Sequence, residues 1–73
     1  MPVNVIYGAD EDEFGSLVGE TFNNAIDAVR DVMGIPDSVT NISLNNDDSP
    51  KSGTILKDGD TIVFYKSGGV KGN

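Results

Sequence analysis

The first apolar run of this 73-residue chain, Val3–Tyr7, alternates between two faces and is rich in β-branched and aromatic residues. Such residues favour an extended strand, because their bulky side chains pack well on a pleated surface. The alternation predicts Val3, Val5 and Tyr7 on one face of the strand. Ile6 lies on the opposite face, which leaves open whether the strand is covered on both sides.

A second strand is predicted soon after the first. Gly8 ends the first run, and the charged stretch 9–13 predicts a loop of several residues rather than a tight two-residue turn. The weaker run Phe14–Val18 then predicts the returning strand, in which Gly15 would mark a bulge. The amino-terminal part of the chain is therefore expected to form a β-hairpin.

A change to helical spacing predicts one amphipathic helix over Glu20–Met33. Its core-facing stripe comprises Phe22, Ala25, Ile26, Val29, Val32 and Met33. Thr21 suits the N-cap, because its hydroxyl can accept a hydrogen bond from an early backbone N–H. Gly34 suits the C-terminal stop. On the outer face of the helix, Asp27 and Arg30 have the spacing of an ion pair.

The segment after the helix returns to alternation. The run Val39–Leu44 predicts a third strand, in which Ile42 and Leu44 share a face. The polar stretch 45–50 that follows predicts a turn or loop. We detect no internal repeat in the chain.

The last apolar runs, Thr54–Leu56 and Thr61–Tyr65, predict two short strands around a turn. Gly59 supplies the positive φ that a tight turn requires, and Asp58 can cap the turn through its own backbone. Asp60 is expected to bond neighbouring amides as the chain enters the last strand. We interpret both aspartates as turn formers rather than as a catalytic pair, because no base, nucleophile or ligand set accompanies them.

Alternation in the last strand divides its side chains into two groups. Ile62 and Phe64 are expected to pack under the helix. Val63 and Tyr65 are expected on the opposite face of the sheet. These two residues, together with Lys66, are the candidate partner-binding residues.

The order of the elements predicts an α+β fold with two layers, in which a small mixed sheet of four to five strands packs on one helix. The whole chain is long enough for one domain only. We assign residues 1–66 to this domain and residues 67–73 to a flexible, glycine-rich C-terminal tail.

Composition narrows the functions that the chain can perform. It has twelve acidic and five basic residues, a formal charge of −7, and neither cysteine nor histidine. Disulfides, thiolate metal sites and histidine-based catalysis are therefore excluded, and we expect no cofactor and no enzymatic activity. The charge argues against nucleic-acid binding, and no apolar run is long enough for a membrane span. We expect a cytoplasmic protein.

Two acidic or polar stretches, 10–13 and 45–48, are candidate ion-binding segments. Neither has the spacing and glycine of a known calcium loop, so we interpret both as solvated. The alternative that remains open is that the stretch 10–13 attracts a cationic partner.

Three segments carry a resemblance to a known fold family. They are Met33–Pro36 at the end of the helix, Ser43–Asn46 at the end of the third strand, and Leu56–Phe64, which reads Leu-x-Asp-Gly-Asp-x-Ile-x-Phe. In this order they resemble the β-grasp fold of ubiquitin and, more closely, the bacterial sulfur-carrier proteins of thiamine and molybdopterin synthesis. The resemblance covers nearly the whole chain, and only the last segment is fairly specific.

The resemblance implies a chemistry that this chain meets only in part. In the carriers, the last strand leads to a terminal Gly-Gly whose carboxylate is adenylated and converted to a thiocarboxylate. Here Gly68 and Gly69 are followed by four more residues. The chemistry that the resemblance implies therefore applies to this chain only if a protease first removes residues 70–73, so that an adenylating enzyme can act on Gly69.

The function expected from the resemblance is that of a small non-enzymatic carrier or ubiquitin-like protein. It would dock its sheet face and its C-terminal tail onto a protein partner. The alternative is a structural or assembly role, for example as a viral accessory protein that makes contacts through a sheet edge or its acidic surface. We expect a monomer or weak self-association.

Overall fold

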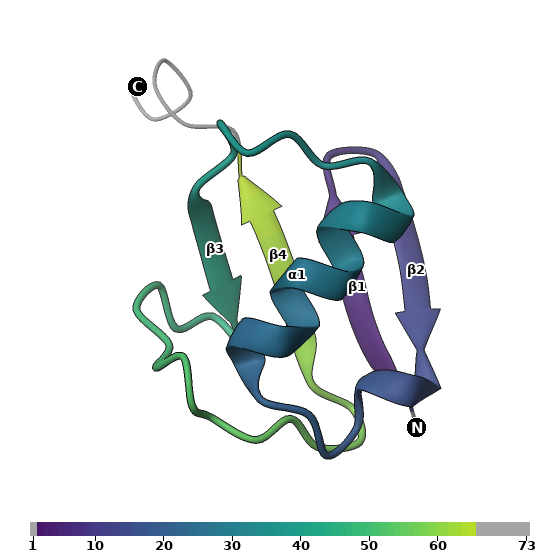
Figure 1. Cartoon of the computed structure of the whole chain (residues 1–73), viewed down its shortest axis with the longest axis vertical. Helices are drawn as coiled ribbons and strands as arrows, with labels where there is room; N and C mark the ends of the chain where they lie inside the picture. Colours follow the sequence, from purple (N-terminus) through teal and green to yellow (C-terminus); the bar gives the residue numbers. More distant parts are fainter. Residues whose placement is uncertain (1, 66–73) are drawn as a thin grey trace.

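The computed structural model describes residues 2–65 and has one α-helix and four strands in that range. The elements in chain order are β1 (Val3–Tyr7), β2 (Asp10–Phe14), the short 3₁₀ helix η1 (Gly15–Leu17), α1 (Phe22–Met33), β3 (Asn41–Leu44) and β4 (Thr61–Tyr65). The helix packs across one face of a single mixed sheet (Figure 1). This two-layer arrangement confirms the predicted α+β architecture.

The sheet has the strand order β2-β1-β4-β3. The two central strands, β1 and β4, are parallel, and each outer strand is antiparallel to its central neighbour. The first and last strands of the described chain therefore lie side by side, with Val5 opposite Ile62. The β-rich ends of the sequence form the centre of the sheet, as expected for strands whose side chains are the most apolar.

The core lies between α1 and the sheet. Alternate residues of the central strands, Val3, Val5, Ile62 and Phe64, are buried there. The helix contributes Phe22, Ala25, Ile26 and Val29, and the connections contribute Leu17, Ile35, Val39 and Leu56. The predicted division of β4 is confirmed on this side, since Ile62 and Phe64 both face the helix.

The ends of α1 confirm two predictions from sequence. The Thr21 hydroxyl accepts a hydrogen bond from the backbone N–H of Asn24 at 3.2 Å, so Thr21 is the N-cap. Gly34 adopts φ 68° at the C-cap, a conformation that glycine reaches without steric cost. The helix begins at Phe22 rather than Glu20, because the cap residue itself has extended backbone angles.

The prediction that Val32 faces the core is wrong. Its side chain is 65% exposed, while Val29, one turn earlier, is fully buried. Val32 lies at the margin of the apolar stripe, whereas Met33 on the same turn of the helix lies nearer its centre and packs against the core. Its exposure makes it a useful control position on the helix side of the molecule.

The prediction for the second strand is also wrong. The acidic stretch expected as a loop forms most of β2. Of the run expected as a strand, only Phe14 belongs to β2, and the residues after it form η1. The connection between β1 and β2 is the two-residue turn Gly8-Ala9, with Gly8 at φ 61° and Tyr7 paired with Asp10. An edge strand open to solvent on both faces needs no apolar residues, which is why hydrophobic pattern did not reveal it. Gly15 starts η1 and marks no bulge.

The third strand is shorter than predicted, because it begins at Asn41 rather than Val39. Val39 belongs to a turn in which its N–H donates to the Pro36 carbonyl at 3.0 Å. Arg30 stabilises this turn by donating to the carbonyls of Pro36 and Val39, each at 2.8 Å. The expected ion pair of Arg30 with Asp27 is absent from the described residues, since the guanidinium is directed toward these carbonyls instead.

The predicted strand Thr54–Leu56 is reduced to a single bridge between Ile55 and Thr21. The turn that follows is as expected, with Gly59 at φ 85°. The Asp60 carboxylate accepts the backbone N–H of Lys57 at 2.8 Å, which confirms its predicted role at the entry to β4.

Candidate functional site

The candidate partner-binding residues of β4 lie on the outer face of the sheet, opposite α1. Val63 is half-buried, and Tyr65 is 42% exposed. The third candidate, Lys66, and the predicted processing residues Gly68 and Gly69 lie outside the described residues. The outer face can therefore be examined up to Tyr65.

Strand pairing extends this face with residues from the other strands. Ile6 of β1 pairs directly with Val63, and Ser43 of β3 pairs with Val63 from the other side. Because paired residues point to the same face of a sheet, Ile6, Val63 and Ser43 form one row across its outer surface. Within residues 2–65, no helix or strand lies on this face. The row is thus a partly apolar surface that no helix or strand of the described residues covers.

Tyr65 shields one end of the row. Its hydroxyl lies 3.5 Å from the hydroxyl of Ser43, which is only 1% exposed although it points to the outer face. Asn41 is the direct cross-strand partner of Tyr65, so the ring reaches along the sheet toward the next residue of β3 on that face. The aromatic side chain thereby covers a polar group while keeping much of its own surface exposed to solvent.

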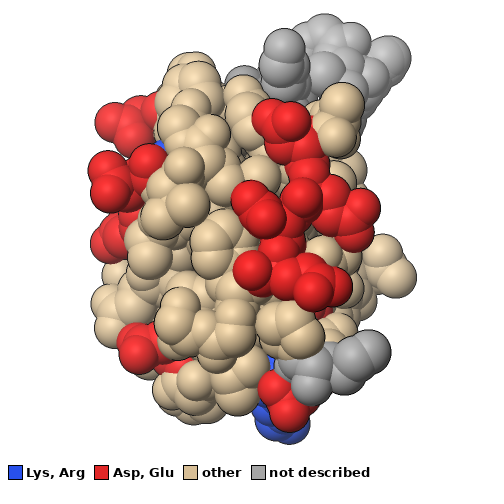
Figure 2. All heavy atoms as spheres, turned by 90° about the vertical axis from the view of Figure 1, so that its right-hand side faces the viewer, with Lys and Arg blue, Asp and Glu red and all other residues tan. Residues whose placement is uncertain are grey.

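The other end of the row meets the acidic edge strand β2. Its residues Asp10–Glu13 are all exposed, and their carboxylates form a stripe along one flank of the molecule (Figure 2). Pairing with β1 puts Glu11 beside Ile6 and Glu13 beside Asn4, on the outer face. Asp10 and Asp12 alternate to the helix side of the strand. Carboxylates therefore border the apolar row on one side.

Asn4 connects the apolar row to the acidic strand. Its side-chain Nδ2 donates to Glu11 Oε2 at 2.8 Å, while its Oδ1 is buried and has no hydrogen-bond partner. An open hollow of about 480 Å³ is lined by Asn4 and by Glu11, Asp12 and Glu13. Leaving a buried acceptor unsatisfied usually costs about 1–3 kcal/mol. Asn4 therefore occupies a position in the central strand β1 at which its unpartnered oxygen is expected to lower the free energy of unfolding.

At the sheet edge opposite β2, Asn45 follows β3 and forms hydrogen bonds with the residues that lead into β4. Its N–H donates to the Thr61 carbonyl, and its side-chain Oδ1 accepts the Thr61 N–H at 2.9 Å. Its Nδ2 donates to Asp60 Oδ1 at 3.0 Å. Asn45 and Asn46 both have positive φ, as a tight two-residue turn requires. Through these hydrogen bonds, the Asn45-Asn46 turn after β3 is connected to the Asp58-Gly59-Asp60 turn before β4.

The N-terminus of α1 offers no anion site, because its free N–H groups are used within the chain. The Phe22 and Asn23 N–H groups donate to the carbonyls of Thr54 and Ser52, at 2.7 and 3.0 Å. Asn24 donates to the Thr21 hydroxyl, as described above. Helix N-termini bind phosphate only when such groups are free. The connection between β3 and β4 therefore fills the place that an anion would take.

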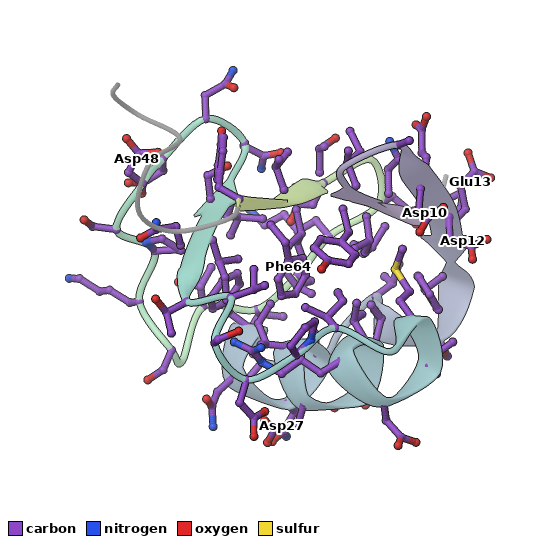
Figure 3. All side chains as sticks on the ribbon, turned by 90° about the horizontal axis from the view of Figure 1, so that it is seen from above. Asp10, Asp12, Glu13, Asp27, Asp48 and Phe64 are labelled. Carbon is purple, nitrogen blue, oxygen red and sulfur yellow. The ribbon has the colours of Figure 1, made fainter. Side chains whose placement is uncertain are left out.

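Charge is distributed unevenly between the two layers and their edges. All twelve acidic residues but only three basic ones, Arg30, Lys51 and Lys57, fall within residues 2–65. Figure 3 shows Asp10, Asp12 and Glu13 together at one edge, Asp27 on the outer side of the helix, and Phe64 between the layers. The half-buried Arg30 lies 5.7 Å from the centre of the Phe64 ring, at the margin of the core.

Residues 2–65 were also searched for metal-ligand groups and for helices able to span a membrane. No group of three or more acidic side chains there is arranged to hold a metal ion. No helix of residues 2–65 is long and apolar enough to cross a membrane. The chemistry available in this part of the chain is that of a surface with apolar, hydroxyl and carboxylate groups.

Comparison with protein-family models, with curated proteins and with solved structures gave no match to this chain. The function must therefore be argued from the surface itself. Sequence reasoning identified Val63 and Tyr65 but missed Ile6, Asn4 and the two outward glutamates of β2 as their neighbours. The alternation of β1 pointed to Ile6, whereas the glutamates required the correct assignment of β2.

Proposed function

We propose that this chain is a non-enzymatic protein-docking module with a β-grasp-like fold. The observation that carries the proposal is the uncovered outer face of the sheet, where Ile6 and Val63 pair directly and Tyr65 lies alongside. Sheets in two-layer domains are usually covered on the apolar face and polar on the other. Apolar side chains on the solvent face are therefore suited to contact with another protein.

The β-grasp assignment is supported by topology and by one sequence segment. The first and last described strands are parallel neighbours at the centre of a four-strand sheet, with a single α-helix on one face. The segment Leu56–Phe64 forms the turn and final strand that the resemblance to sulfur carriers implies, and Leu56 is buried beneath the helix layer. These features favour a ubiquitin-like docking protein over an enzyme, as does the absence of histidine and cysteine.

The docking proposal is tested by comparing equal changes on the two sides of the molecule. We expect Val63→Asp and Tyr65→Ala to abolish retention of a partner from extracts of the native host. Val32→Asp, which also introduces a carboxylate at an exposed valine, should leave retention unchanged. Circular dichroism establishes that each variant is folded. Equal retention by all variants would show that the outer face is not the docking surface.

A covalent form of this function rests on sequence alone. If residues 70–73 are removed, Gly69 becomes a terminal carboxylate that an adenylating enzyme can activate. The intact mass of the protein isolated from its host decides this point. A mass ending at Gly69 supports trimming, whereas a population that ends only at Asn73 contradicts the covalent mechanism and leaves docking in place.

Assembly through sheet edges is the weaker alternative. The β2 edge carries four adjacent carboxylates, which repel a second copy of the same strand. At β3, both main-chain groups of Leu44 are already bonded to Asp47, at 3.0 and 2.9 Å. The acidic β2 edge is therefore poorly suited to pairing between copies, and the Leu44 end of the β3 edge is already bonded, which favours a different partner.

A further inference from the structure

We infer that the partner of the outer face is a basic protein segment that presents Lys or Arg next to an apolar side chain. The inference rests on the proposed docking function and specifies the chemistry of the partner. It follows from the position of two carboxylates, Glu11 and Glu13, along the border of the apolar row.

The first step is the geometry of the face. Ile6 and Asn4 are two residues apart on the same side of β1, which separates them by about 7 Å in an extended strand. Val63 continues the apolar row from Ile6, while Glu11 and Glu13 stand beside Ile6 and Asn4 on β2. An extended segment that places one apolar residue over the row can thus bring a cationic residue over the hollow.

The second step is the chemistry of the hollow beside Asn4. Two of its lining residues are exposed glutamates on the outer face. Among residues 2–65, the only side-chain hydrogen bond of either carboxylate is the one that Glu11 accepts from the Asn4 amide. Among residues 2–65, no lysine or arginine forms an ion pair with either glutamate. Arg30, the only arginine, binds two carbonyls on the helix side. A guanidinium or ammonium from another molecule would supply the missing positive charge and N–H donors.

The third step is the net charge of the chain, which disfavours a second copy as the occupant. Two chains that each carry a formal charge of −7 repel one another, and no basic residue on the described outer face could meet the glutamates of a partner copy. Charge complementarity therefore selects a basic partner. The apolar row then limits binding to segments that combine positive charge with an apolar contact.

The test uses a blocked Lys-Val-Arg-Val-Lys-Val peptide as probe and the full ¹⁵N-labelled chain in an NMR titration. We expect shift changes at Asn4, Ile6, Glu11 and Val63. The double variant Glu11→Gln, Glu13→Gln should weaken binding about two- to thirtyfold, since each of the two exposed ion pairs contributes roughly 0.2–1 kcal/mol. The matched control Asp27→Asn, Asp31→Asn removes the same charge from the outer side of α1 and should bind as the wild type does.

Several outcomes would overturn the inference. Shift changes spread equally over the α1 carboxylates and β2 would show attraction by net charge alone. Equal weakening by the two double variants would show the same. Equal binding of a Glu-Val-Glu-Val-Glu-Val peptide would show instead that positive charge on the partner is not required. If Val63→Asp abolishes retention of the host partner while Glu11→Gln, Glu13→Gln retains it fully, docking stands and the basic partner is excluded. If neither variant affects retention, the docking function itself fails.

Discussion

The two faces of the sheet are built from neighbouring residues of the same strands but are covered very differently. Val5 and Ile62 are completely buried under α1, while the adjacent Ile6 and Val63 lie half-buried on the outer face. The helix face is closed by apolar packing and by Arg30, whereas the outer face mixes apolar, amide and carboxylate groups. The helix face supplies the core that stabilises the fold. The outer face carries side chains that the core does not use, and we propose that they serve recognition.

The sharpest way to separate the two faces is to truncate adjacent residues of β4. Ile62→Ala should lower the free energy of unfolding by about 2–5 kcal/mol, because it leaves a cavity in a fully buried position. Val63→Ala should cost about 1 kcal/mol or less, because its side chain is only half-buried. Urea unfolding of both variants measures the difference. Equal losses would contradict the division into a structural and an exposed face.

Substitutions of Arg30 test whether its hydrogen bonds stabilise the turn that follows α1. Arg30→Met keeps an apolar stem but removes the bonds to the Pro36 and Val39 carbonyls. We expect a loss of about 1–3 kcal/mol in the free energy of unfolding. Arg30→Lys should fall between Met and wild type, because an ammonium cannot reproduce the planar two-carbonyl contact. Unchanged unfolding of the Met variant would show that these bonds do not stabilise the turn.

A substitution of Asn4 tests whether a polar residue on the outer face lowers the free energy of unfolding. Asn4→Val removes the buried, unpartnered Oδ1 and adds a residue that favours strands. It also removes the bond to Glu11. We expect a net gain of about 0.5–1 kcal/mol in the free energy of unfolding. A lower midpoint in urea would mean that the carboxamide supports the sheet and is not retained for binding.

The smallest effect on stability is expected at the acidic border. Glu11→Gln, Glu13→Gln should change the free energy of unfolding by less than about 0.5 kcal/mol, because both residues are exposed. The change should be a gain at low salt, where like-charge repulsion along β2 is greatest, and should disappear at high salt. Thermal unfolding at both ionic strengths measures it. A large loss would mean that these glutamates are needed for folding.

The helix side could be predicted from sequence because burial leaves a periodic pattern. The spacing of Phe22, Ala25, Ile26 and Val29, the Thr21 cap and the Gly34 stop all specified local structure through local chemistry. The alternation of Ile62 and Phe64 specified their burial. Val32 was misassigned because periodicity does not reveal how wide the buried stripe is, and Val32 lies at its margin.

The outer face was harder to predict because its residues come together only through strand pairing. The edge strand Asp10–Phe14 resembles a loop in sequence, since solvent covers nearly all of it. Only its register with β1 brings Glu11 beside Ile6. The hydrogen bonds of Asn45 with Asp60 and Thr61 likewise join residues that are far apart in sequence.

The central claim is that the outer face contacts a protein partner. Its most direct test places the photo-crosslinker p-benzoylphenylalanine at Tyr65 on the outer face, or at Val32 on the helix side, in the native host. We predict a discrete crosslinked adduct from position 65 that is lost when Val63→Asp is added, and none from position 32. Adducts of equal yield from both positions, or an adduct from position 32 alone, would contradict the account.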